Sequence, residues 1–170
     1  ENGQFTYVID YANTDPLLQY AVDPDSGLVT VRNNLDRETE EVMTVHILAI
    51  DEGEPAMTGT GTLTVTVQDV NDNAPRLAED YVGFVYASTR AGDAVLLLEA
   101  VDDDAPENGE PITFTLDCNQ PECNDFSIQR QSDSSAVIRA ELNGYDRLTL
   151  GRSFYDLPIT LTDSGSPAMS

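Results

Sequence analysis

The chain has 170 residues, of which 31 are acidic and 8 are basic, so its formal charge is −23. A surface this acidic repels phosphate backbones, which excludes nucleic-acid binding and disfavours anionic membrane surfaces. The hydrophobic share of 40% is sufficient for a folded core. No apolar run approaches the roughly 18 to 20 residues of a membrane-spanning helix.

The predicted elements are almost all strands separated by turns. In chain order, residues 43–49, 62–67 and 155–161 alternate apolar side chains with other types, as half-buried strands do. Clusters of Asp, Gly and Pro at residues 51–55 and 163–167 indicate turns after two of these strands. The apolar spacing of a helix is not sustained anywhere. The pattern predicts an all-β chain of the sandwich kind.

An internal repeat sets the expected domain organisation. Residues 51–58 (DEGEPAMT) recur as residues 163–170 (DSGSPAMS), so the period is about 110 residues, the size of one β-sandwich. We expect one domain at residues 1–75 and a second at residues 76–170. The first lacks its opening strands and the second lacks its last strand, so we expect the sequence to be a window of a longer chain.

Four acid-rich elements are candidate metal ligands. They are residues 35–38 (LDRE), residues 69–75 (DVNDNAP) between the repeats, residues 102–104 (DDD), and Asp163 after the last expected strand. Hard divalent cations such as Ca²⁺ bind about six to eight oxygen atoms from carboxylates, carboxamides and backbone carbonyls. Seven acids of these elements cannot converge unless cations offset their repulsion: Asp36, Glu38, Asp69, Asp72, Asp102, Asp104 and Asp163.

Taken in order, these motifs resemble the extracellular cadherin repeats. The resemblance rests on LDRE, on Ala49-Ile50-Asp51 at a strand end, on D-x-NDNAP, on D-x-D and on Asn108-Gly109. It implies tandem seven-stranded Greek-key β-sandwiches of the immunoglobulin-like kind. It also implies a calcium-dependent cell-cell adhesion protein, not an enzyme, in which this chain is an ectodomain stalk segment made rigid by Ca²⁺.

The resemblance also implies partners and a location. The partners are other cadherin molecules, homophilic or heterophilic, bound through outer repeats that are not in this window. Neither a nucleic acid nor a small-molecule substrate is implied. The location is the extracellular part of a single-pass or lipid-anchored protein of the plasma membrane.

The resemblance implies three Ca²⁺ ions between the two repeats, which would bring the formal charge from −23 to −17. Asp36 and Glu38 would reach the ions from the first repeat. The other ligands would be Asp69, the Val70 carbonyl, Asn71, Asp72, the Asn73 carbonyl, Asp102, Asp104, the Asn108 carbonyl and Asp163. Asn2 and Asp51 would belong to a site towards a preceding repeat.

The motifs are most like the penultimate and membrane-proximal repeats of catenin-linked or lipid-anchored cadherins. The second repeat has Tyr86-Ala87-Ser88 where the family places a Glu, and Asp146-Arg147-Leu148 where it places LDRE. A last repeat and an interior calcium-free joint both fit these departures. The alternative function is that of a giant or receptor-type cadherin, in which the same sites serve signalling or force transmission.

Three other interpretations were weighed. An EF-hand needs Gly and Glu where this chain has Ala74 and Asp80. An aspartic protease needs two facing Asp loops, whereas Asp51 and Asp163 are one repeat apart. A fibronectin-like or immunoglobulin-like sandwich without ion function is the remaining rival, and calcium titration separates it.

Two further features concern covalent chemistry. Cys118 and Cys123, in a polar loop of a secreted β-domain, favour a local disulfide over a metal site. The chain has no N-x-Ser/Thr sequon. The threonines of residues 60–66 share one strand face, which indicates either simple β propensity or, by the resemblance, O-mannosylation.

Overall fold

The computed structural model describes residues 4–14, 19–117, 120–151 and 153–170. The chain divides into two compact units, Glu1–Gln68 and Asp69–Ser170. Among the described residues, every paired strand is antiparallel and the helices are single turns. The all-β prediction is therefore confirmed. No helix in these ranges is long and apolar enough to span a membrane.

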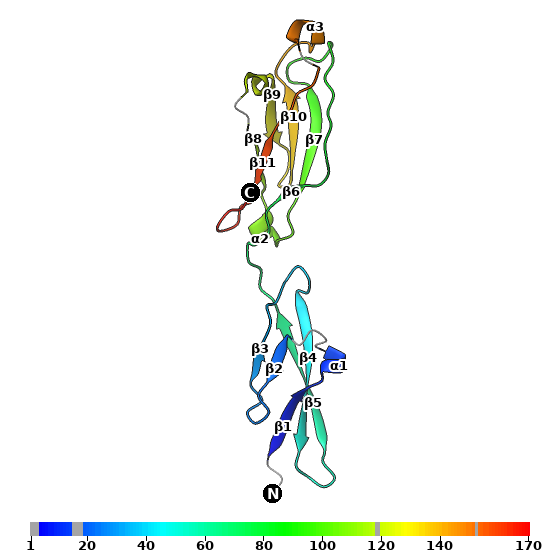
Figure 1. The fold of residues 1–170 in the computed structure, drawn as a ribbon, viewed down its shortest axis with the longest axis vertical. Helices are drawn as coiled ribbons and strands as arrows, with labels where there is room; N and C mark the ends of the chain where they lie inside the picture. Colours follow the sequence, from blue (N-terminus) through cyan, green and yellow to red (C-terminus); the bar gives the residue numbers. More distant parts are fainter. Residues whose placement is uncertain (1–3, 15–18, 118–119, 152) are drawn as a thin grey trace. The chain divides into compact units, whose positions relative to one another are not determined.

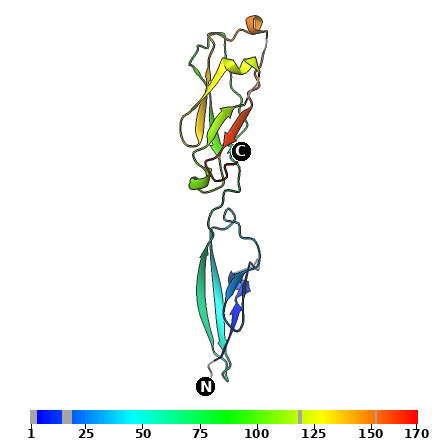
Figure 2. The same ribbon diagram turned by 90° about the vertical axis from the view of Figure 1, so that its left-hand side faces the viewer.

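The first unit contains two antiparallel sheets (Figure 1). Strands β1 (Phe5–Ile9), β4 (Val42–Asp51) and β5 (Thr58–Thr66) form one sheet in the order β1-β4-β5. Strands β2 (Tyr20–Val22) and β3 (Val29–Val31) form the other, and the one-turn helix α1 (Tyr11–Thr14) follows β1. In Figure 2 the long β4–β5 hairpin and the β2–β3 pair lie on opposite sides of this unit.

The core of the first unit lies between these two layers. It is formed by Ile9, Tyr20, Met43 and Val45, and the 0% exposure of Val45 places it at the centre. Because side chains alternate across a strand, residues on the other face of β4 and β5 point outwards. On that face the His46 Nδ1 lies 3.2 Å from the Thr62 hydroxyl oxygen. His46 and Thr62 are thus neighbours on the outward face of this sheet.

The second unit also contains two sheets. One has the strand order β6-β7-β10-β9, formed by β6 (Arg76–Leu77), β7 (Ala94–Val101), β10 (Ser135–Ala140) and β9 (Phe126–Arg130). The other pairs β11 (Ile159–Thr162) with β8 (Thr113–Leu116). Three single turns connect these strands: α2 (Pro106–Gly109), the 3₁₀ helix η1 (Pro121–Asp125) and α3 (Arg147–Leu150).

Two apolar clusters hold the second unit together. The larger one contains Leu98, Ile138 and the aromatic pair Phe126 and Tyr145, whose ring centroids lie 5.4 Å apart. Tyr155 packs against both rings. The smaller cluster contains Ala100, Ile112 and Leu161. In the sequence, Ile112 follows α2 and Leu161 precedes residues 163–170. The rigid strands thus carry the acidic loops at their ends.

The strand expected at residues 155–161 is shorter than the sequence indicates. Tyr155 and Leu157 do pack against the core, but the paired strand begins only at Ile159. Pro158 has no N–H to donate to a ladder, although its carbonyl accepts the Asp117 N–H at 3.0 Å. The alternation therefore correctly predicts the buried face but not the start of the strand.

Candidate metal centre

The segment at residues 69–75, called the linker segment below, is held to the second unit by hydrogen bonds at both ends. The Asp69 carboxylate accepts the Ala105 N–H at 3.1 Å and the Asn108 side-chain amide at 2.7 Å. Asn73 donates its backbone N–H and its side-chain amide to the Asp104 carboxylate at 3.2 and 2.8 Å. The linker segment is thus docked on residues 102–109, which contain α2 and are called the α2 loop below.

Asn71 joins the linker segment to a second loop, residues 163–169, called the Asp163 loop. Its side-chain amide lies 3.4 Å from both carboxylate oxygens of Asp163 and donates to the Pro167 carbonyl at 2.5 Å. Asn71 and Asp163 are 9% and 5% exposed. Residues that are far apart in sequence therefore meet at one buried position.

The Asp163 loop has the same hydrogen bonds as its repeat at residues 51–57. In the Asp163 loop, Gly165 and Met169 donate their N–H groups to the Asp163 carboxylate at 2.9 and 3.1 Å. In the first unit, the N–H groups of the corresponding glycine and methionine bond Asp51 at 2.9 and 2.8 Å. These bonds lower the pKa of the Asp51 carboxyl because they favour its charged form. The internal repeat is therefore a repeat of structure.

Asp102 and Asp104 bring two more carboxylates to the same end of the second unit. Asp102 accepts the Asp104 N–H at 3.0 Å, and Asp104 is 7% exposed. Burial raises the pKa of the Asp102 carboxyl, although its bond to the Asp104 N–H lowers it. The neighbouring charges of Asp104 and Asp163 raise it further. A cation close to Asp102 would oppose these effects, because it favours the charged form of the carboxyl.

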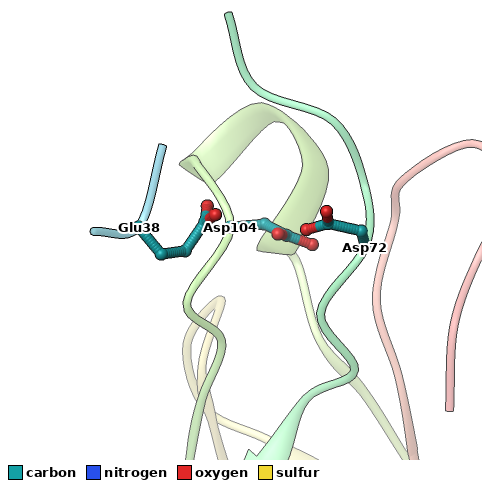
Figure 3. A group of neighbouring side chains, drawn as sticks. All are labelled: Glu38, Asp72 and Asp104. Atoms are coloured by element: carbon teal, nitrogen blue, oxygen red, sulfur yellow. The ribbon is translucent and has the colours of Figure 1, made fainter. Parts of the chain in front are cut away.

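Asp72 adds a carboxylate that has few protein contacts. It is exposed, and its Oδ1 accepts a hydrogen bond from the Asn73 side-chain amide at 3.0 Å. Oxygens of Asp72 and Asp104 lie within 4.8 Å of one another, and both side chains are drawn in Figure 3. The carboxylates of the linker segment and of the α2 loop are therefore close enough to share one cation.

Two buried oxygens of this group have no hydrogen-bond partner within the described part of the chain, namely Asn71 Oδ1 and Asp102 Oδ2. A buried polar atom without a partner costs about 1–3 kcal/mol. Carboxylates, a carboxamide and backbone carbonyls are the donors that Ca²⁺ prefers over soft or nitrogen-rich sets. The residues of the second unit therefore fit a hard divalent cation.

The ligands expected in the first unit lie before β4. The Asp36 carboxylate accepts the Thr39 hydroxyl at 2.8 Å and the Glu38 N–H at 3.1 Å. The Thr39 hydrogen bond is the main reason that the pKa of Asp36 is lowered. The Glu38 carboxylate lies 2.5 Å from the Arg37 guanidinium. This loop therefore holds the carboxylates of two neighbouring acidic residues before β4.

Several other residues were named from the sequence. Val70 is 66% exposed, and because its side chain has no donor atom only its backbone carbonyl could be a ligand. Asn108 uses its side-chain amide to bond Asp69. Asn2 lies outside the described residues. Cys123 is buried and is not free, but Cys118 also lies outside the described residues, so their pairing stays a prediction.

Sequence reasoning missed the contacts that support these ligands. The Pro167 carbonyl, the Ala105 N–H and the close approach at Gly165 were not foreseen. The repeated D-x-G-x-P pattern at residues 51–55 and 163–167 was a signal for the glycine and the proline. The Ala105 contact had no signal, because it depends on how the linker segment folds back.

Antiparallel β-sandwich units with an oxygen-rich acidic segment between them define a class of repeat-built protein. Residues 1–68 match the model of the cadherin domain. Cadherin-7 of Mus musculus is 37% identical over 169 residues, which cover 99% of this chain and 21% of that protein. Neural-cadherin of Drosophila melanogaster is 38% identical over 179 residues, covering 99% of this chain and 6% of that protein. The chain therefore contains cadherin repeats.

Solved structures have the same fold. Mouse Cadherin-23 repeats EC22-24 superpose with a TM-score of 0.77 at 21% identity, covering 98% of this chain and 49% of that one. Protocadherin gammaB7 repeats EC3-6 give 0.72 at 27% identity, covering 99% and 37%. The β-sandwich prediction is therefore confirmed. The chain spans about a fifth of the length of Cadherin-7.

Proposed function

We propose that this chain is a calcium-binding segment of a cell-adhesion ectodomain. Cadherin family proteins are adhesion proteins rather than enzymes, and the relatives named above support this assignment. The observation that carries the calcium part is a pair of buried oxygens, Asn71 Oδ1 and Asp102 Oδ2, that have no hydrogen-bond partner among the described residues and lie among converging carboxylates. Cations near these atoms would replace the interactions that the protein itself does not supply.

The ligands divide between the two units. The second unit would supply the whole linker segment together with the α2 loop and the Asp163 loop. Asp36 and Glu38 would come from the first unit, and three Ca²⁺ ions would bind in all. The ligands proposed from the second unit are Asp69, the Val70 carbonyl, Asn71, Asp72, the Asn73 carbonyl, Asp102, Asp104, the Asn108 carbonyl and Asp163.

Bound Ca²⁺ would supply the positive charge that allows these carboxylates to stay close together. The protein's part is to hold the linker segment in place, which the bonds from Asn73 to Asp104 and from Asn108 to Asp69 accomplish. With the linker segment fixed, added ligands from the first unit would turn a hinge into a rigid joint. Extracellular modules bind Ca²⁺ with dissociation constants of about 10⁻⁴ to 10⁻³ M, so extracellular calcium would keep the sites largely filled.

We further propose the position and partners that the motifs indicate. The chain would be the penultimate and membrane-proximal repeats of a single-pass or lipid-anchored protein of the plasma membrane, divided near Pro75. Residues 86–88 have no Glu, and residues 146–148 (DRL) stand in place of the LDRE motif. The second repeat therefore lacks motifs needed for another triple-calcium site, which supports this position. Adhesion would be to other cadherin molecules through outer repeats.

Calorimetric titration of the chain with Ca²⁺ tests the proposal, because it predicts binding heat and a higher melting temperature. A sandwich without ion function predicts neither. Small-angle scattering with calcium and with chelator tests the stiffening. Unchanged maximum dimension and interdomain order on chelation would contradict that part.

A second candidate is a giant or receptor-type cadherin whose sites serve signalling or force transmission. Protocadherin Fat 4 of Homo sapiens supports it, being 35% identical over 168 residues, which are 99% of this chain but 3% of that protein. The protein sequence on either side of these residues separates the two candidates. Another NDN linker after Ser170 favours the long array, and a membrane anchor there favours the membrane-proximal position.

A further inference from the structure

One glycine of the Asp163 loop is in unusually close contact with the linker segment. A Cβ atom placed on Gly165 would lie less than 3.0 Å from Cγ, Nδ2 and Oδ1 of Asn71. Other glycines differ: Gly59, for example, has no atom within 4 Å of the corresponding position. The missing side chain at position 165 therefore provides the space that the Asn71 amide occupies.

The Asn71 amide cannot turn away from this contact without losing its bonds. It is buried, it donates to the Pro167 carbonyl at 2.5 Å, and it lies 3.4 Å from the Asp163 carboxylate. Rotation of the side chain would give up the Pro167 bond and the approach to Asp163 together.

The loop under the amide is also fixed. Gly165 donates its N–H to Asp163 at 2.9 Å, the Asp163 N–H bonds the Met169 carbonyl at 3.1 Å, and the Ser164 hydroxyl bonds the Glu110 carbonyl. The first two bonds close the loop on itself, and the third attaches it to the segment that follows α2. A side chain at position 165 would therefore displace the Asn71 amide before it displaced the loop.

The backbone of Gly165 does not itself demand glycine. Its φ lies outside the positive region that L residues rarely adopt, unlike that of Gly92 or Gly144. Alanine at position 165 thus meets no backbone strain, and the Asn71 side chain is its nearest obstacle. The three atoms nearest to the added Cβ all belong to Asn71, so mutation of Asn71 can separate this constraint from others.

We propose that Gly165 is a positioning residue of the calcium site, acting through Asn71. Its lack of a side chain seats the Asn71 amide against Asp163, and this contact ties the linker segment to the Asp163 loop. Seating the amide nitrogen against Asp163 also fixes the position of Asn71 Oδ1, the proposed ligand, which has no hydrogen-bond partner among the described residues. This inference rests on the proposed function, since it concerns the same site. Gly109, whose added Cβ would meet the Asp102 Cβ at 3.0 Å, is a milder case of the same kind.

The test compares Gly165→Ala with Gly59→Ala in the full chain, with chelator and with Ca²⁺. Gly165→Ala is expected to weaken Ca²⁺ binding at one ion position by about 10–100-fold, as the loss of supporting contacts around a metal typically does. It should also reduce the Ca²⁺-induced rise in melting temperature. Gly59→Ala should leave both quantities at their wild-type values. An unchanged calcium affinity in Gly165→Ala overturns the proposal.

A double-mutant cycle with Asn71→Ala separates positioning from general damage to the fold. In the Asn71→Ala background, Gly165→Ala should cause no further loss of stability or of calcium affinity, because its obstacle has been removed. An equal loss in both backgrounds overturns the proposal, because alanine would then clash with something else. The same cycle is also measured in chelator, with the free energy of unfolding as the readout. Coupling between positions 71 and 165 is expected there even if the wild type binds no Ca²⁺. A wild type without calcium response refutes the proposed function, whereas absent coupling in chelator refutes the role of Gly165.

Discussion

Asp72 offers a perturbation whose effect should reverse with calcium. It is exposed, belongs to none of the apolar clusters, and accepts a bond from the neighbouring Asn73 amide. Asp72→Ala removes that exposed bond and also a carboxylate within 4.8 Å of Asp104. Two like charges at this separation repel by about 1 kcal/mol in water. In chelator the variant should therefore be as stable as the wild type, or slightly more stable.

With calcium the order should reverse. At about 10 mM Ca²⁺ and dissociation constants of about 10⁻⁴ to 10⁻³ M, one bound ion stabilises a fold by about 1.4–2.7 kcal/mol. If Asp72 serves one or more ions, Asp72→Ala should lose up to this increment for each ion that it serves. Denaturation by urea in both conditions measures it, with Asp80→Ala as a control that removes another exposed carboxylate.

Equal calcium-induced stabilisation of Asp72→Ala and the wild type would refute the role of Asp72. A loss of the same size in Asp80→Ala would mean that the effect is one of net charge. Small-angle scattering adds a second readout, because the variant's maximum dimension should no longer depend on chelation while both folds stay intact.

Three predictions concern the fold that carries the site. Leu98→Ala should lower the free energy of unfolding by about 2–5 kcal/mol, because Leu98 is 1% exposed in the main core; a loss below about 1 kcal/mol in urea denaturation would contradict this packing. Tyr145→Phe should cost about 1–3 kcal/mol by the same measurement, since the hydroxyl donates to the Asp125 carbonyl and accepts two backbone N–H groups. An equal loss for the exposed Tyr86→Phe would show that the hydrogen bonds are not the cause. Asp23→Ala should lower the melting temperature at neutral pH, because bonds from the Ser26 hydroxyl and N–H lower the pKa of Asp23 below 3.8. A carboxyl whose pKa is lowered by folding stabilises the folded state at pH values above its unfolded pKa. This stabilisation is lost as the pH falls through its folded pKa, so the melting temperatures of the variant and the wild type should converge in acid. A difference that persists unchanged at about pH 2 would contradict this assignment.

Local patterns were sufficient to predict several elements. The alternation around Met43 and Val45 identifies a strand and its buried face, because side chains alternate on a β-strand whatever packs against them. The repeated loops after β4 and β11 were likewise visible in the sequence. Their carboxylates accept N–H groups only two and six residues ahead, so short-range geometry determines them.

Other features could not be predicted from local patterns. The strand at residues 155–161 has an alternating face, but a ladder forms only where a partner strand and free N–H groups are available, from Ile159 onwards. The linker segment contains oxygen donors at every second position, yet nothing in that run says that Asp69 bonds Asn108 or that Asn73 bonds Asp104. These contacts depend on how the segment folds back onto the second unit.

The sequence by itself therefore determined the all-β class, the internal repeat and the resemblance to cadherin repeats, and it named the candidate oxygen donors. Only the tertiary structure decided which donors are buried together, because that depends on contacts such as Asn71 with Asp163, 92 positions apart. It also decided where a side chain must be absent. Whether a side chain fits at a position depends on the segment that packs against it. The requirement for glycine at position 165 is therefore seen only in the structure, where Asn71 lies against it.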